Sequence, residues 1–359
     1  MKILTYLIVL MVVHSGFCQS VDSTNLVVKE RYNQAFRVID EMLSGQKKLS
    51  FKKAVLSTEK AYLGKEIDTA AFYNGIFELA KRCEHFQATN TLLYDKKDKS
   101  NVSKWGSIFK VMTDTTYYPL VGNFGMGYKP FSYDFDDFFG DKDWTKMFVS
   151  KLLTNGSGNC HSLPFLYKIL AEELGVAAHL ALAPNHIYIK HQSIKNGWYN
   201  TELTSAAFPI DAWIMASGYI HLDAIQNKVY MKALDDKESI AICLTDLAEG
   251  YKRRMASPDP EFILRCCNTA LQYFPNYINA LILKAETLKF KHDSFVKNNA
   301  SRDHKETANT MFTEMQNLYV HIHELGYRQM PKEMYFKWIV ELKTEREKYE
   351  NRSVTGNVK

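Results

Sequence analysis

In the stretch GSGNCHSLPFLYKILAEELG at residues 156–175, a small-residue turn leads into a predicted apolar helix. Its leucines recur at helical spacings of 3, 4 and 4 residues: Leu163, Leu166, Leu170 and Leu174. Pro164 is tolerated only in the first turn of a helix, so the helix is predicted to begin at 160–163. Gly175 has the position of a C-terminal capping glycine. Cys160 is therefore predicted to lie at the N-terminal end of this helix.

Three strands are predicted directly after the helix. Their sequences are VAAHLALAP at 176–184, NHIYIKHQ at 185–192 and WYNTELT at 198–204. If the last two pair as a hairpin around 193–195, paired residue numbers sum to 388 and His186 lies opposite Glu202. Asn200 shares that face because side chains alternate along a strand, and a slip of one residue would separate His186 from Glu202. The pattern predicts an α+β fold.

Cys160 is the candidate nucleophile. A thiol attacks as its thiolate, and a helix N-terminus lowers the thiol pKa because its free N–H groups and dipole favour negative charge. The preceding GSGN turn leaves room for a substrate carbonyl and lets the Cys160 N–H donate to an oxyanion. Such a site also needs a histidine to take the proton and a third group to orient that histidine. The strands supply His186 and, on the same face, Asn200 and Glu202.

Each candidate residue also has a structural interpretation. Cysteine is among the most buried residue types, so Cys160 is alternatively a core residue and His186 a structural histidine. Three other histidines are expected to be structural or at the surface: His161, His179 and His191. A metal site is not expected, because no pair of candidate ligands has the short spacing of common zinc sites.

An aromatic segment precedes the cysteine. Residues 117–144 are rich in Tyr and Phe and are punctuated by Gly and Pro. Pro130 and aromatic residues follow the glycines where a phosphate-binding loop would open a helix, so no phosphate loop is predicted. The segment is expected to be irregular and pinned to the core by its rings, with one wall of a substrate groove as the alternative.

The N-terminus has the pattern of a secretory signal. Lys2 precedes an apolar run at 3–13 that is too short to cross a bilayer, and cleavage is predicted after Cys18. Lipidation of Cys18 and an uncleaved anchor are the alternatives. The protein is therefore expected to be exported, periplasmic or extracellular, with membrane attachment only through lipidated Cys18. A net charge of +5 gives no indication of a nucleic-acid partner.

The C-terminal part is predicted to be a separate helical unit. The breaker SPDP at 257–260 precedes two helical stretches with small and turn residues at positions typical of a tetratricopeptide repeat: Ala270, Pro275 and Ala285. The predicted organisation is a signal at 1–18, a helical segment at 19–49, an α+β domain at 50–250 and tetratricopeptide-like helices at 256–350. A protein partner that binds these last helices is possible in this interpretation. The five remaining cysteines are odd in number and lack a CxxC pair, so no disulfide framework is expected.

Three segments together resemble the transglutaminase-like superfamily, most closely its SirB1-type branch. They are GNCHSLPFLYKILAEELG, APNHIYIK and GWYNTELT, and the upstream stretch KKAVLSTEKAYLGKEIDTAAFYNGIFELA is similar to the helical lead-in of that branch. The resemblance covers about residues 50–225. It implies a papain-like core with Cys160 as nucleophile, His186 as base and Glu202 as orienting acid. The superfamily usually has Asp-Pro-Thr where this chain has Glu-Leu-Thr, so Asn200 is kept as the alternative third residue.

The resemblance and the residues favour an enzyme without a cofactor. The expected activity is that of a cysteine-dependent hydrolase or acyl transferase, acting on an amide bond of a peptide or protein through a thioester. The alternative is a non-catalytic binding or scaffold protein with a vestigial site.

Overall fold

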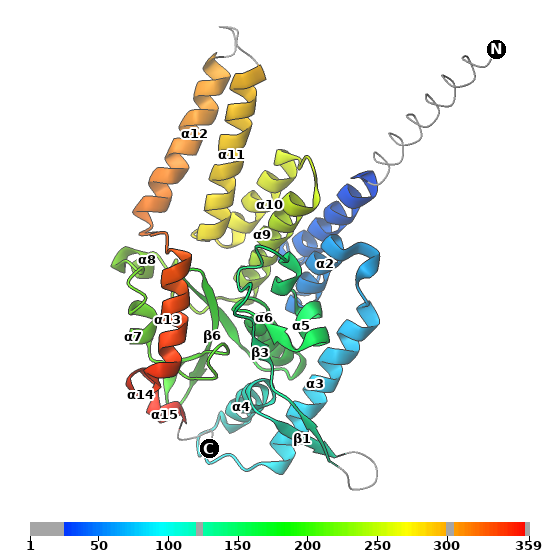
Figure 1. Ribbon diagram of the computed structural model, residues 1–359, viewed down its shortest axis with the longest axis vertical. Helices are drawn as coiled ribbons and strands as arrows, with labels where there is room; N and C mark the ends of the chain where they lie inside the picture. Colours follow the sequence, from blue (N-terminus) through cyan, green and yellow to red (C-terminus); the bar gives the residue numbers. More distant parts are fainter. Residues whose placement is uncertain (1–24, 120–124, 299–304, 356–359) are drawn as a thin grey trace, which may run out of the picture.

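The computed structural model describes residues 25–119, 125–298 and 305–355 (Figure 1). The expected signal and Cys18 lie outside these ranges. Within them, no helix combines the length and hydropathy needed to cross a membrane. Helices and small sheets make up an α+β architecture, as expected at this coarse level.

The N-terminal part is helical. A helix at 25–43 is followed by α2 (Phe51–Leu63), η1 (Gly64–Glu66), α3 (Thr69–Thr89) and α4 (Lys99–Thr113). The side chains of Ser50 and Asp68 accept hydrogen bonds from backbone N–H groups in the first turns of α2 and α3, which is why those helices begin there. Helices α2, α3 and α4 pack against α6 (Ser162–Glu173), whose residues from Ser162 to Ala171 are all buried. The predicted apolar stripe is thus part of a helix that is covered on every side.

Three antiparallel strands form the main sheet, in the order β5 (His179–Ala183), β6 (His186–Ser193) and β7 (Gly197–Thr201). The predicted pairing of β6 with β7 is wrong by one step: Lys190 pairs with Asn200, a sum of 390 rather than 388. Gly197 has φ +64° and ends the hairpin loop, so the turn is centred one residue later than expected. The sum of paired residue numbers is still even, so each side chain points to the predicted face of the sheet.

Two smaller pairs of strands lie around the aromatic segment. β1 (Thr116–Pro119) pairs with β2 (Gly125–Tyr128), and β3 (Ser132–Tyr133) runs parallel to β4 (Ser157–Gly158). Between β3 and β4 in the chain lie η2 (Trp144–Met147) and α5 (Val149–Asn155). The pairing of β3 with β4 holds the aromatic segment against the turn that carries Cys160.

The C-terminal part is helical, and its helices do not form a detached unit. After α7 (Asp211–Met215) and α8 (Leu222–Gln226) come α9 (Asp236–Arg254), α10 (Pro260–Tyr273), α11 (Ile278–Asn298) and α12 (Lys305–Glu324). One hydrophobic core joins residues of α2, α6, α9, α10 and α11, so it runs across the boundary expected near residue 256. Helices α11 and α12 form a pair that projects from the body (Figure 1).

The chain then returns to the sheet. Helix α13 (Lys332–Thr344) runs beside β6, followed by the short α14 (Arg346–Tyr349) and α15 (Arg352–Thr355) (Figure 1). Tyr335 and Trp338 of α13 share a hydrophobic cluster with Cys160, Tyr188 and Trp213. The last helices therefore pack on the part of the molecule where the candidate residues lie.

Candidate active site

Cys160 lies in the turn that starts α6. Asn159 holds this turn, because its Oδ1 accepts the backbone N–H groups of His161 and Ser162, each at 3.0 Å. Gly158 is required there, since a Cβ would lie 2.6 Å from Ser162 Oγ and 2.9 Å from Leu152 Cδ1. The predicted start of the helix at 160–163 is confirmed.

His186 and Glu202 meet in the buried interior. His186 Nε2 donates to Glu202 Oε2 at 2.6 Å. Glu202 Oε1 accepts from the backbone N–H and the hydroxyl of Thr204, at 2.8 and 2.7 Å. The predicted contact of His186 with Glu202, which directly follows β7, is confirmed, and both oxygens of the carboxylate accept hydrogen bonds.

Asn200 does not contact His186. It pairs with Lys190, four residues further along β6, which is about 13 Å at the rise of a strand. Its Nδ2 donates instead to Pro209 O at 3.0 Å and to Asp211 Oδ1 at 2.8 Å. The alternative in which Asn200 orients the imidazole is therefore wrong, since facing the same side of a sheet does not bring residues so far apart together.

The thiol and the imidazole stabilise each other's charged forms. Burial by itself raises the pKa of Cys160, but the hydrogen bond with His186 and the charge of that ring outweigh it and lower the pKa. Burial lowers the pKa of His186, and the charge of Glu202 with hydrogen bonds to Cys160 and Glu202 raises it to about 10. Both shifts favour the charged forms, a thiolate beside an imidazolium.

The other described cysteines differ from Cys160. All five described cysteines, Cys160 included, are free and buried. Burial raises the pKa of Cys83 and Cys267 to about 12, and it also raises the pKa of Cys243 and Cys266 well above the ordinary value. Among the cysteines that the structure describes, a lowered pKa is found at Cys160 alone.

Two tyrosines at the site were missed by the sequence analysis. The Tyr335 hydroxyl lies 3.1 Å from His186 Nδ1 and 3.1 Å from the Tyr133 hydroxyl. Both tyrosine side chains also interact electrostatically with Cys160, whose Sγ lies 3.7 Å from Asn185 O. Tyr133 lies within the predicted aromatic segment, but no local pattern connects Tyr335 with a histidine 149 residues earlier.

A second histidine–carboxylate pair is formed by His161, the residue that follows Cys160. His161 Nδ1 lies 2.9 Å from Met147 O, and Nε2 lies 3.0 Å from Asp246 Oδ2. Both partners are acceptors, so both ring nitrogens must donate and the ring is an imidazolium. Burial lowers the pKa of His161, but the charge of Asp246 outweighs it and raises the pKa. The positive ring also lowers the pKa of Cys160.

The other two histidines are structural, as expected. His179 Nδ1 lies 2.9 Å from Leu234 O. His191 is buried, lies 3.0 Å from the Tyr167 hydroxyl and stacks on Trp105. Burial lowers the pKa of His191 well below its ordinary value, so this ring is neutral.

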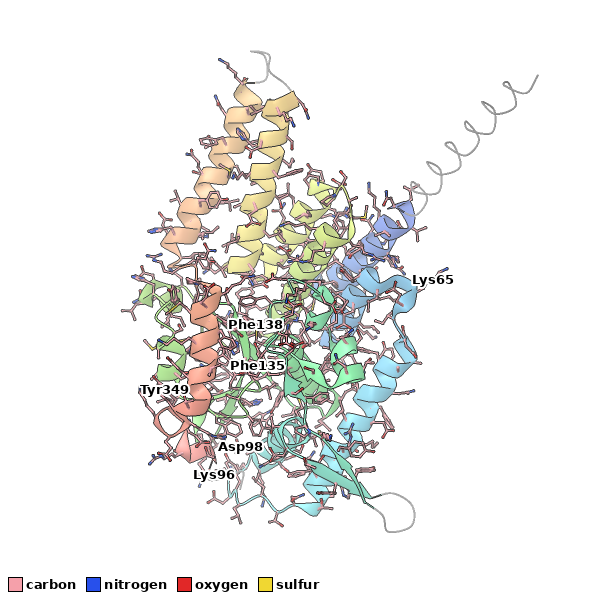
Figure 2. The ribbon with its side chains drawn as sticks, in the orientation of Figure 1. Lys65, Lys96, Asp98, Phe135, Phe138 and Tyr349 are labelled. Atoms are coloured by element: carbon pink, nitrogen blue, oxygen red, sulfur yellow. The ribbon has the colours of Figure 1, made fainter. Side chains whose placement is uncertain are left out.

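Cys160 and His186 open onto a cavity of about 320 Å³. They are only 4% and 2% exposed, because α13 covers them. Phe138 and Phe139 line the cavity, and Phe138 stacks on Tyr335 with ring centres 5.3 Å apart. Figure 2 shows Phe135 and Phe138 in the middle of the molecule beside α13. The aromatic segment is thus both packed by its rings and one wall of the cavity.

Among the described residues, no three His, Cys, Asp or Glu side chains are grouped so that they could hold a metal ion. No family model matches the sequence, and no curated protein or solved structure is significantly similar to it.

Proposed function

We propose that this protein is a cysteine-dependent hydrolase or acyl transferase that acts on an amide bond of a peptide or protein. Cys160 is the nucleophile, His186 transfers the proton and Glu202 orients the ring. The observation that carries the proposal is that Cys160 lines the same cavity as a histidine whose Nε2 is held by Glu202 at 2.6 Å, a ring that lowers the pKa of the thiol.

The reaction follows from these positions. The Cys160 thiolate attacks the carbonyl carbon, and the tetrahedral oxyanion can accept the Cys160 backbone N–H. As the C–N bond breaks, His186 gives its Nδ1 proton to the leaving nitrogen, and a thioester remains on Cys160. His186 then takes a proton from water, or from an amine, which attacks the thioester and restores the thiol. Hydrolysis and transfer differ only in this second acceptor.

The finer fold is part of the same proposal. A cysteine at a helix start, packed against antiparallel strands that carry His186 and Glu202, supports a transglutaminase-like, papain-like core. Ala270 of α10 and Ala285 of α11 are fully buried, which supports a tetratricopeptide-like contact between these helices. Export of the protein and a partner on these helices are further parts of the proposal.

The test uses a thiol-directed activity probe on the native full-length protein. We expect one adduct by intact mass spectrometry, on Cys160 by peptide mapping, and none in Cys160→Ala. The other described cysteines are buried with raised pKa values, so they serve as internal controls.

One observation favours the alternative of a non-catalytic binding protein with a vestigial site. Tyr335 of α13 contacts His186, and Cys160 is almost fully covered. A folded wild-type protein that no probe labels, but whose Cys160 reacts after denaturation, would favour this alternative over the enzyme.

A further inference from the structure

We infer that the cavity beside Cys160 receives a cationic group of the substrate, an ammonium or a guanidinium. This inference rests on the proposed function, because it names the class of amide substrate that would reach the thiol. Such a substrate would place its positive group against α9 and α11 and its carbonyl at Cys160.

The first observation is the charge of the side chains that line the cavity. Away from Cys160, the lining includes three carboxylates: Asp246, Glu249 and Glu286. Among the described residues that line the cavity there is no Lys or Arg. The side chains of the three carboxylates are 17, 24 and 54% exposed, so water and ligands can reach them.

Asp246 already pairs with His161, which lines the cavity, whereas the cations that contact Glu249 and Glu286 do not line it. Arg253 pairs with Glu249 and lies over the Trp144 ring, with 4.0 Å from the guanidinium carbon to the ring centre. Lys252 Nζ lies 3.5 Å from Glu286 on a side chain that is 45% exposed. Exposed pairs of this kind are weak, so the carboxylates keep the capacity to bind a second cation from the cavity side.

A buried hydroxyl in the same wall lacks a partner. Thr245 is 4% exposed, lines the cavity and precedes Asp246. Its Oγ1 makes no hydrogen bond of normal geometry with any described residue, although the Tyr277 hydroxyl lies near it. Buried polar atoms are nearly always paired, and an ammonium or guanidinium has several N–H donors to offer.

Aromatic side chains complete the wall. Four rings besides those of the aromatic pair Phe138 and Phe139 line the cavity: Trp144, Tyr230, Tyr277 and Tyr327. Aromatic rings attract cations through their faces, and Trp144 already holds Arg253 in this way. Carboxylates, an unpaired oxygen and rings together fit a cation, whereas an anionic group would find neither Lys nor Arg in this lining.

The test compares two reagents of similar size and opposite charge. Cys160 is modified with 2-aminoethyl methanethiosulfonate (positive) or 2-sulfonatoethyl methanethiosulfonate (negative), and the two rates are measured by peptide mass spectrometry. We expect the ratio of positive to negative rate to exceed that of 2-mercaptoethanol by about tenfold or more, as a charged cavity concentrates the opposite charge. His161 and His186 are cationic, so they act against this result and make it stringent.

The matched variant is the double substitution Glu249→Gln, Glu286→Gln, which leaves the His161 partner Asp246 intact. We expect the rate ratio to fall about fivefold or more, while Glu78→Gln, on the exposed face of α3, leaves it unchanged. A Cys160 that reacts with both reagents at the ratio of 2-mercaptoethanol, or an unchanged ratio in the double variant, overturns the cation site alone. A folded protein whose Cys160 reacts with neither reagent overturns the proposed function as well.

Discussion

Two histidine–carboxylate pairs lie near Cys160, and they are built differently. In the pair of His186 with Glu202, only Nε2 meets a carboxylate, and Nδ1 lies 3.1 Å from the Tyr335 hydroxyl. In the pair of His161 with Asp246, both nitrogens meet oxygen acceptors that cannot supply a proton. The first ring can exchange a proton at its Nδ1, whereas the second is held as a fixed positive charge.

The difference shows that residue type does not decide the role of a histidine. Both rings are buried and both have raised pKa values. What distinguishes them is the partner of the second nitrogen: a hydroxyl for His186, a backbone carbonyl for His161. We therefore expect His186 to act in proton transfer and His161 to act only through its charge on the thiol.

The largest effect is expected for Cys160→Ser, which removes the group that both pairs serve. Labelling and amidase activity should be lost completely, because an alcohol keeps its proton far above neutral pH. The free energy of unfolding, measured by urea denaturation, should change by less than about 1 kcal/mol, because His186, Tyr133 and Tyr335 can pair with the hydroxyl. A loss of about 1–3 kcal/mol would instead indicate a hydroxyl buried without a partner.

His186→Gln comes next, since it removes the proton-transferring ring. The Cys160 pKa should rise to the ordinary value near 8.5 or above it, because burial is no longer outweighed by His186, so at most about 3% of the thiol is ionised at pH 7 and iodoacetamide alkylation slows. In the wild type, alkylation should stay fast as the pH falls until it passes below the lowered Cys160 pKa. Above about pH 10 His186 loses its proton, so activity that needs the imidazolium should decline there. Equal pH profiles in both proteins would contradict the pairing.

Glu202→Gln is expected to reduce activity in part. An amide can still bond to Nε2 and orient the ring, but it lacks the charge that raises the His186 pKa. The upper limb of the pH profile should move below 10, with a fall in kcat of about tenfold or more. Asn200→Ser is the control on the neighbouring strand position, and it should leave both the profile and the labelling rate unchanged. An effect of Asn200→Ser as large as that of Glu202→Gln would argue against Glu202 as the orienting group.

The smallest effect is expected for His161→Gln, which removes the fixed charge and keeps a donor for Asp246. The acid limb of the labelling profile should move to higher pH, so labelling at pH 6 slows about threefold, and the upper limb near pH 10 should stay in place. A purely structural role would lower the melting temperature without moving the acid limb. If the upper limb moved as well, His161 would share the proton transfer and the two pairs would not differ.

Local pattern alone determined the core of the site. The glycine turn, Pro164 and the leucine spacing place Cys160 at the start of α6, because helix sterics and capping act over a few residues. The alternation of β6 and β7 places His186 and Glu202 on one face, although the position of the turn, and so the pairing step, was off by one. Parity is robust to such a step because moving the turn by one residue shifts the sum by two.

Contacts between distant segments were decided only by the tertiary structure. Tyr335 reaches His186 across 149 residues, and Asp246 reaches His161 across 85, through helices whose sequences show amphipathic packing but not what they pack against. Asn200 was predicted as an alternative partner of His186 because both side chains lie on one face of the sheet. The distance along the strand separates the two residues. The sequence thus determined which groups could react, and the packing of α9 and α13 decided their charges and cover, because electrostatics depends on neighbours in space rather than along the chain.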